Sequence, residues 1–435
     1  MATLITKLLW SERLRNLLKK RICDIVVTHQ TDRLAEKGKI MAIQMAIIGC
    51  GGMANGHLNA YLTIHQTEPG KVELVAMCDE VKERADQFAE RVKEVTGKKP
   101  AVFDDTDTML ATVDLDGADI CTSHAHHHIN ALKCLNNGVN VIVEKPMGVT
   151  VKATHAIINA AKANNKIAAT AENIRRMPSR RTAEWLMNEK QMLGDLWTFS
   201  AQHASYRAPN PESDWHWRLD LTLGGGGMVM DSGAHYCDTL RYLFGDPSTV
   251  YARVCQFEDL RVTKAGEIVK NEQEDTWVAT INFKSGVIGL WTCTWAAIGH
   301  GFNHVVYYGS EGCLLDDGDI FHGPFDGAEV ILKDGTRHSM ESLTADYMAS
   351  LSDEEKSKLF PHNFTDGVVL ECYDFVDAIE NNRPPELDAE VGLRAKSICE
   401  AIYESNACGQ AVDYEEVVAG NIEVYQKPIN ERWGL

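Results

Sequence analysis

Short apolar runs alternate with amphipathic stretches over the first 170 residues or so of the chain. Runs rich in β-branched residues indicate strands, whereas apolar residues spaced three and four apart indicate helices. The expected strands cover residues 44–48, 74–78, 118–121, 139–143 and 167–171. The expected helices cover residues 54–63, 81–95, 128–136 and 151–163. This alternation predicts an α/β domain with a parallel sheet and helices on both faces.

The pattern changes beyond residue 173, where β-rich runs follow one another. Residues 276–283 and 287–294 are two such runs without a helix between them. Further strands are expected at residues 197–203, 249–257, 305–308 and 329–332. Consecutive strands predict an α+β domain with a large open, mostly antiparallel sheet.

Residues 1–40 differ from both parts. Basic residues such as Lys7, Arg13 and Lys19 alternate with leucines, which fits a basic amphipathic helix. Such a helix could touch a membrane surface. We favour an arm that packs on its own domain or on a neighbouring subunit. A start of the protein at Met41 or Met45 is also compatible with the sequence.

Charge and cysteine content limit the function classes. The chain has 62 acidic and 43 basic residues, a net charge of −19, which disfavours binding to nucleic acid. It has no apolar run near the roughly 18–20 residues of a membrane span, so no membrane partner is expected. None of its twelve cysteines forms a C-x-x-C pair, which argues against a metal site of that kind. Free thiols favour a cytoplasmic protein.

A glycine turn follows the first strand. Gly49, Gly51, Gly52, Met53 and Ala54 belong to a G-x-G-x-x-A pattern that opens the first helix. In such a pattern the first glycine permits the turn, the second admits a pyrophosphate, and the third small residue packs against the strand. Amide groups at the helix start bind the phosphates. These five residues are therefore predicted to bind a dinucleotide.

Asp79 ends the second strand. An acid at this place bonds the adenosine ribose and repels the extra phosphate of NADP, so NAD is the expected cofactor and NADP the less favoured one. The alternative is that Asp79 only caps the helix that starts near residue 81. Its separation from the glycines exceeds the usual ~20 residues, which a loop at residues 64–70 would explain.

Two later motifs carry a family resemblance. Glu144-Lys145-Pro146 closes the strand at 139–143, and residues 225–238 read G-G-G-M-V-M-D-S-G-A-H-Y-C-D after Trp217-Arg218-Leu219-Asp220. With these motifs, residues 44–412 resemble the Gfo/Idh/MocA oxidoreductases, the family of glucose–fructose oxidoreductase and inositol dehydrogenase. The resemblance implies a Rossmann NAD-binding domain at 41–172 and a substrate-binding and oligomerisation domain at 173–435, preceded by the arm at 1–40.

The resemblance also implies that Lys145, Asp231 and His235 line the active site. An alcohol loses its hydroxyl proton as hydride leaves its carbon, so a base must reach that oxygen. His235 titrates in the required range, and Lys145 would stabilise the negative charge on the same oxygen. Asp231 would orient the imidazole or bond a neighbouring hydroxyl. If residues 231–238 are helical, Asp231 and His235 share one face.

The turn after the fourth strand departs from the family pattern. Thr122 fits it, His124 replaces the usual asparagine, and His127 stands at the usual histidine. We interpret this turn as a helix start beside the cofactor and not as a metal cluster. His124 could also contact substrate. Thr122, His124, His127, Glu144 and Lys145 thus complete the predicted cofactor site.

Substrate contacts are predicted from aromatic and arginine side chains, because rings suit the apolar faces of sugars and arginine bonds their oxygens. The predicted substrate-binding residues are Arg176, Trp217, Arg218, Asp231 and His235. Arg175, Trp215 and His216 are further candidates.

Together these features predict an NAD-dependent oxidoreductase that oxidises, or reversibly reduces, a ring secondary hydroxyl of a sugar, glycoside or cyclitol. One alternative is a redox glycosidase that keeps NAD bound through its cycle. Another is a regulator that senses NAD or sugar without turnover, which the presence of both Lys145 and His235 disfavours. The open sheet predicts a homo-oligomer.

Overall fold

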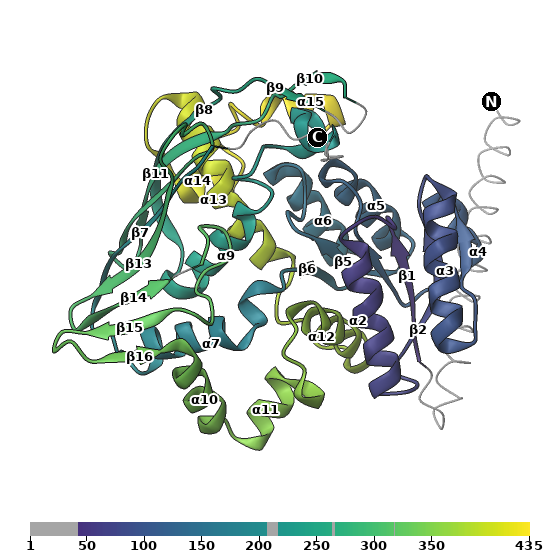
Figure 1. The fold of residues 1–435 in the computed structure, drawn as a ribbon. Coiled ribbons are helices and arrows are strands. Elements are labelled where there is room, and N and C mark those ends of the chain that lie inside the picture. The colour runs from purple at the N-terminus through teal and green to yellow at the C-terminus, as the bar shows by residue number, and fades with distance from the viewer. Residues whose placement is uncertain (1–41, 207–215, 263–265, 317) are drawn as a thin grey trace, which may run out of the picture. The chain divides into compact units, whose positions relative to one another are not determined.

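The computed structural model describes residues 42–206, 216–262, 266–316 and 318–435 (Figure 1). The predicted helix in residues 1–40 and the candidate Trp215 lie outside these residues, as does the side chain of His216. The chain divides into two units, Met1–Ala42 and Ile43–Leu435. All of the described helices and strands belong to the second unit.

Six parallel strands form the first sheet. They are β1 (Ile43–Ile48), β2 (Val72–Cys78), β3 (Ala101–Phe103), β4 (Gly117–Ile120), β5 (Asn140–Glu144) and β6 (Ala168–Ala171). Their order is β3-β2-β1-β4-β5-β6, which confirms the predicted Rossmann-like sheet. The strand order reverses between β1 and β4, and a ligand binds such sheets beyond the carboxyl ends of the strands at this point.

Five helices connect these strands. They are α2 (Ala54–Thr67), α3 (Lys82–Thr96), α4 (Thr106–Thr112), α5 (His124–Asn136) and α6 (Val151–Asn164). The loop predicted at residues 64–70 is wrong, because α2 continues to Thr67. Ile64 extends the buried face of α2 that Leu58 and Tyr61 begin. The long separation between the glycines and Asp79 therefore comes mainly from a longer helix.

Nine strands form the second sheet, in the order β16-β15-β14-β13-β7-β12-β11-β8-β17. They are β7 (Leu196–Ala204), β8 (Pro247–Cys255), β11 (Thr276–Phe283), β12 (Ile288–Thr294), β13 (Phe302–Gly309), β14 (Gly312–Asp316), β15 (Glu329–Leu332), β16 (Arg337–Ser339) and β17 (Val412–Asp413). Only β7 and β12 pair in parallel, so the predicted mostly antiparallel sheet is confirmed. A separate ribbon joins β9 (Leu260–Val262) to β10 (Ile268–Lys270).

The α-helices beyond residue 173 are α7 (Pro178–Glu184), α8 (Leu221–Gly224), α9 (Gly233–Phe244), α10 (Met340–Ser350), α11 (Asp353–Leu359), α12 (Gly367–Asn381), α13 (Ala389–Cys408), α14 (Tyr414–Val418) and α15 (Lys427–Trp433). Helix α12 returns to lie beside α2 (Figure 1), and its Phe375 shares a buried cluster with Met45 of β1. Helix α12, from the C-terminal part of the chain, thus packs against the first sheet. No described helix is long and apolar enough to cross a membrane.

Candidate active site

The glycine turn has the shape that a dinucleotide requires. Gly49 has a φ of +88°, and an added Cβ would lie 2.8 Å from the carbonyl carbon of Cys121 at the end of β4. At Gly51 and Gly52 an added Cβ would meet nothing within 4 Å, so the backbone has an open side. Met53 is 42% exposed beside it, whereas Ala54 is buried against the sheet. The open backbone at the start of α2 fits a bound pyrophosphate.

Asp79 holds the glycine turn to the end of β2. Its Oδ2 accepts a hydrogen bond from the backbone N–H of Cys50 at 2.7 Å, and its Oδ1 accepts one from Val81 at 2.8 Å. The second bond lies before α3, but the N-cap of α3 is Val81, and no described side chain caps this helix. The alternative that Asp79 caps α3 is therefore wrong, and its contact with the ribose stays a prediction.

Lys145 follows β5 and bonds to Asp231. Its ammonium donates to the carbonyl oxygen of Asp231 at 3.0 Å and to Oδ1 at 3.3 Å, while Arg218 donates to Oδ2 at 2.9 Å. Burial raises the pKa of Asp231, but the charge of Lys145 and contacts with His124 and Arg218 lower it well below its usual range. Asp231 is therefore a carboxylate that fixes the position of Lys145.

His235 is oriented by Glu172. The imidazole Nδ1 lies 2.9 and 2.8 Å from the two carboxylate oxygens of Glu172, which follows β6 and is 2% exposed. Burial raises the pKa of Glu172, but the charge of His235 and its hydrogen bond lower it below the usual value overall. An ionised Glu172 keeps the proton on Nδ1 and leaves Nε2 able to accept one.

The predicted helical pairing of Asp231 with His235 is wrong. Helix α9 begins at Gly233, so Asp231 precedes it and meets Lys145. Glu172 takes the place beside His235, although no sequence motif pointed to this residue. Its one signal was an acid at the carboxyl end of a parallel strand, next to the strand that carries Lys145. Glu172 and Lys145 line the same small cavity.

His124 joins this group of residues. Its Nδ1 lies 2.8 Å from the carbonyl oxygen of Gly224, and its Nε2 lies 3.6 Å from Asp231 Oδ1. Its ring centroid is 4.7 Å from that of Trp217. Burial lowers the pKa of His124 below its ordinary value. The structure thus brings His124 and Arg218 to Asp231, and Trp217 to the ring of His124.

His127 and Thr122 pack beside the glycine turn and the ends of neighbouring strands. The ring nitrogens of His127 lie 2.9 Å from the carbonyl oxygen of Pro146 and 3.0 Å from that of Thr122. Burial lowers the pKa of His127 to about 4. The Cγ2 of Thr122 would lie 2.9 Å from a Cβ on Gly49, so it closes one side of the turn. His127 therefore braces the ends of two strands.

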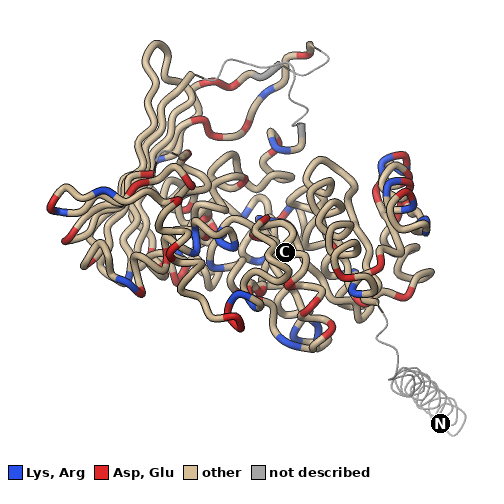
Figure 2. Tube along the Cα trace, turned by 60° about the horizontal axis from the view of Figure 1, so that its bottom comes forward, with Lys and Arg blue, Asp and Glu red and all other residues tan. Residues whose placement is uncertain are grey.

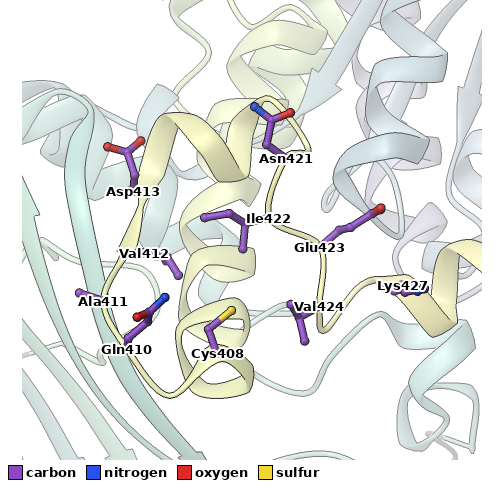
Figure 3. Close-up of a pocket in the computed structure, with 10 residues that line it drawn as sticks. All are labelled: Cys408, Gln410, Ala411, Val412, Asp413, Asn421, Ile422, Glu423, Val424 and Lys427. Atoms are coloured by element: carbon purple, nitrogen blue, oxygen red, sulfur yellow. The ribbon is translucent and has the colours of Figure 1, made fainter.

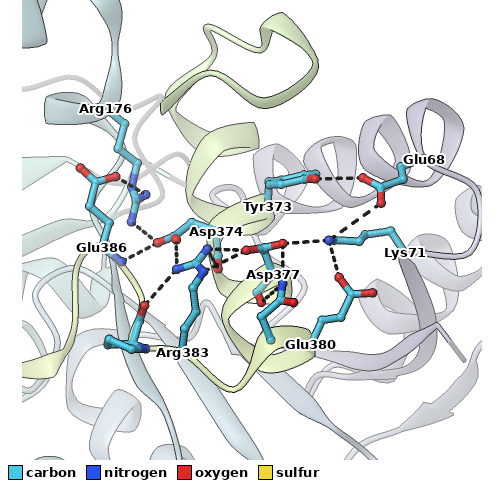
Figure 4. A network of polar contacts seen from close by, with 11 residues as sticks. Glu68, Lys71, Arg176, Tyr373, Asp374, Asp377, Glu380, Arg383 and Glu386 are labelled. Carbon is cyan, nitrogen blue, oxygen red and sulfur yellow. Dashed lines mark hydrogen bonds and ion pairs between the residues drawn. The ribbon is translucent and has the colours of Figure 1, made fainter. Parts of the chain in front are cut away.

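Arg176 lies apart from this group. Its guanidinium is buried and donates to Glu386 at 3.0 Å and to Asp374 at 3.2 Å. Figure 4 shows these contacts continuing through Arg383 towards Lys71, which lies beyond the end of α2. The structure gives Arg176 a place in an ion-pair network, so it lends no support to the predicted substrate contact. Arg175 is likewise paired with Asp238.

Glu144 is held by a buried histidine. His57 of α2 lies 2.9 Å from Glu144 through Nε2 and 2.8 Å from Asp119 through Nδ1. Burial lowers the pKa of His57, but the charge of Asp119 and their hydrogen bond raise it well above its usual value overall. Glu371 also lies 3.7 Å from His57. The ligand atoms of His57, Glu144 and Glu371 lie within 4.8 Å of one another.

A separate surface pocket lies beyond the end of α13 (Figure 3). It is lined by Cys408, Gln410, Ala411, Val412, Asp413, Asn421, Ile422, Glu423, Val424 and Lys427. Glu423 is already paired with Lys152 at 2.6 Å. The pocket contains none of the predicted site residues and does not belong to the site around Lys145.

Comparison with known families covers both sheets. Residues 43–172 match "Oxidoreductase family, NAD-binding Rossmann fold", and residues 186–315 match "GFO/IDH/MocA C-terminal domain". The chain is therefore an oxidoreductase of the class with an NAD-binding Rossmann fold. It belongs to the Gfo/Idh/MocA family.

Curated relatives and solved structures agree with this assignment. The chain is 28% identical over 257 residues to D-glucoside 3-dehydrogenase of Escherichia coli, covering 57% of this chain and 69% of the relative. It is 23% identical over 345 residues to myo-inositol 2-dehydrogenase of Thermotoga maritima, covering 77% and 90%. A levoglucosan dehydrogenase in complex with NADH and levoglucosan has a TM-score of 0.70 at 22% identity, covering 86% and 99%. The structural likeness shows the shared fold.

Proposed function

We propose that the chain is an NAD-dependent dehydrogenase that oxidises, or reversibly reduces, a ring secondary hydroxyl of a sugar, glycoside or cyclitol. The observation that carries this proposal is that Lys145, just after β5, and His235, in α9, are each anchored by a carboxylate. Lys145 is held by Asp231, and His235 is held by Glu172. The names of the relatives, which act on glucosides and inositol, favour the same substrate class.

The chain supplies an electrostatic contact and a base. Bound NAD supplies the acceptor for the hydride that leaves the carbinol carbon. The ammonium of Lys145 donates a hydrogen bond to the substrate oxygen and stabilises the negative charge that develops there. Nε2 of His235 takes the hydroxyl proton, while the carboxylate of Glu172 stabilises the resulting imidazolium. In the reverse direction His235 returns this proton.

The proposed cofactor is NAD and not NADP. Gly49, Gly51, Gly52, Met53, Ala54 and Thr122 would hold it. The carboxylate of Asp79 stands at the end of β2, where an acid repels a ribose 2′-phosphate. Glu144 and Lys145 end the strand next to β4 and would meet the nicotinamide side.

Trp217 and Arg218, which lie just before α8, would contact the substrate. The Arg218 guanidinium lies 4.1 Å from the ring centroid of Trp217, and its side chain is 33% exposed. An aromatic ring beside a guanidinium offers a sugar an apolar surface and hydrogen-bond donors. Arg218 and Lys145 both bond Asp231, so a substrate held by Arg218 would lie near Lys145.

We also infer a homo-oligomer that forms through the second sheet. Tyr251, Val278, Ile288 and Tyr308 are each at least 40% exposed and share one sheet face by register. Strands β7, β11, β12 and β13 contain no Asp, Glu, Lys or Arg (Figure 2). The register places the exposed Arg253 of β8 opposite Val278 on the same face. A face with several exposed apolar side chains and few charges is typical of a subunit interface. Light scattering that finds only monomer contradicts this inference.

The activity is tested by incubating the protein with NAD, and separately with NADP, and methyl β-D-glucoside, myo-inositol or levoglucosan. Absorbance of reduced nicotinamide is followed for the wild type, Lys145→Ala and His235→Ala. We expect reduction of NAD with one substrate class and a loss of roughly 10²–10⁴-fold in His235→Ala. Tight NAD binding without reduction of any compound would favour the redox glycosidase or the sensing regulator instead.

A further inference from the structure

A second histidine stands beside His235. The ring of His322, from the segment between β14 and β15, has its centroid 5.4 Å from that of His235, with the planes tilted by 40°. No recognisable motif surrounds His322 in the sequence, so only the fold reveals its place beside the site.

The two histidines are anchored in the same way. Nδ1 of His235 bonds both oxygens of Glu172, and Nδ1 of His322 lies 2.9 and 3.0 Å from the oxygens of Asp319. Asp319 Oδ1 also accepts the backbone N–H groups of Phe321 and His322. Burial raises the pKa of Asp319, but the bond and charge of His322 and these N–H groups lower it overall. The segment therefore holds His322 with an ionised carboxylate before any ligand binds.

Nε2 of each ring is available. Among the described parts of the chain, neither Nε2 has a hydrogen-bond partner. The side chain of His322 is 31% exposed and that of His235 is 12% exposed. A histidine that serves only packing does not need a carboxylate on Nδ1 and an open Nε2. Within the residues that the structure describes, two neighbouring rings thus each keep an unpaired Nε2, and the His322 side chain is the more exposed of the two.

We propose that His322 binds the substrate hydroxyl next to the one on which His235 and Lys145 act. The substrate class is then a ring with two adjacent free hydroxyls. With Asp319 holding the proton on Nδ1, Nε2 of His322 accepts a hydrogen bond from the second hydroxyl. This inference rests on the proposed function, because it places the reacting hydroxyl at His235.

The test uses binding as well as turnover. Calorimetry measures the affinity of methyl β-D-glucoside, myo-inositol and levoglucosan for the NADH-loaded wild type, His322→Ala and His322→Gln. His304→Ala, an exposed histidine of β13, is the control. We expect His322→Ala to lose at least about tenfold in affinity and His322→Gln to lose less, because an amide oxygen still accepts the bond. NADH affinity stays at the wild-type value.

The neighbouring hydroxyl itself is tested with deoxy analogues of the polyol that binds. An analogue without the hydroxyl beside the reacting carbon binds the wild type and His322→Ala equally in our proposal. An equal loss in His304→Ala, an unchanged affinity in His322→Ala, or no binding of any of the three polyols to the wild type overturns it. Polyol binding that depends on His322, without reduction of NAD, would instead contradict only the proposed dehydrogenase activity.

Discussion

Nε2 of His57 lies 2.9 Å from the carboxylate of Glu144, and both side chains are buried. His57 belongs to α2, which the glycine turn opens, and Glu144 precedes Lys145 at the end of β5. One buried ionic contact therefore connects the predicted dinucleotide turn to the predicted catalytic strand. Its partners also include Asp119, so removal of the imidazole would leave two buried carboxylates without this partner.

Replacement of His57 should destabilise the fold. Loss of one partner from a buried ion pair costs about 3–5 kcal/mol, because the remaining charge is left without compensation. We expect His57→Ala to lower the free energy of unfolding in urea by this amount. His65→Ala, in the last turn of the same helix, is the control and should cost less than about 1 kcal/mol. Equal stabilities of the two variants contradict an ionic role for His57.

Two glycines of the turn should respond differently to alanine. Gly49→Ala puts a Cβ against the backbone of Cys121 at positive φ, so we expect a protein that unfolds at lower temperature. Gly51→Ala has room for its methyl group, so it should fold as the wild type does. The methyl group would take the space of the pyrophosphate and weaken NADH binding at least about tenfold. NADH fluorescence titration and thermal unfolding of both variants separate these effects.

Glu172→Gln should impair the proton transfer without changing the size of the side chain. A neutral amide stabilises the imidazolium of His235 less than a carboxylate does. We expect kcat to fall up to about 10²-fold, within the range that a positioned acid–base contributes. NADH affinity should remain, and exposed Glu189→Gln should keep full activity. Unchanged kcat in Glu172→Gln would show that His235 does not need its anchor.

Glu400 should make stability depend on pH. Burial raises the pKa of this carboxyl to about 7 in spite of its contact with Lys396. A folded pKa above the ordinary 4.5 gives stability that is present below pH 4.5 and is lost as pH rises through 7. The loss between pH 5 and 8 should be about 2–3 kcal/mol.

Urea unfolding of Glu400→Gln measures this contribution. The amide cannot ionise, so the variant should show a flatter dependence of unfolding free energy on pH between pH 5 and 8. Exposed Glu390→Gln should keep the slope of the wild type. A wild-type slope in Glu400→Gln would place the titration elsewhere.

The amino-acid sequence by itself determined the parallel sheet, the glycine turn at Gly49 and the motifs that contain Lys145 and His235. These features are local: periodicity reports which face of an element is buried, and a turn residue reports its own backbone. Local patterns do not predict at which residue a helix or strand ends. Helix α2 passed its predicted end because Ile64 continued the buried face.

The tertiary structure decided which side chains meet. Glu172 and His235 come from different elements, and no spacing in the chain predicts their contact. In the folded chain Asp231 bonds Lys145, and Arg176 belongs to an ion-pair network. The ring of His322 likewise lies beside that of His235. Contacts between distant segments depend on how helices and sheets pack against one another. The sequence therefore predicted most of the candidate reacting groups, and the tertiary packing determined which side chains orient them.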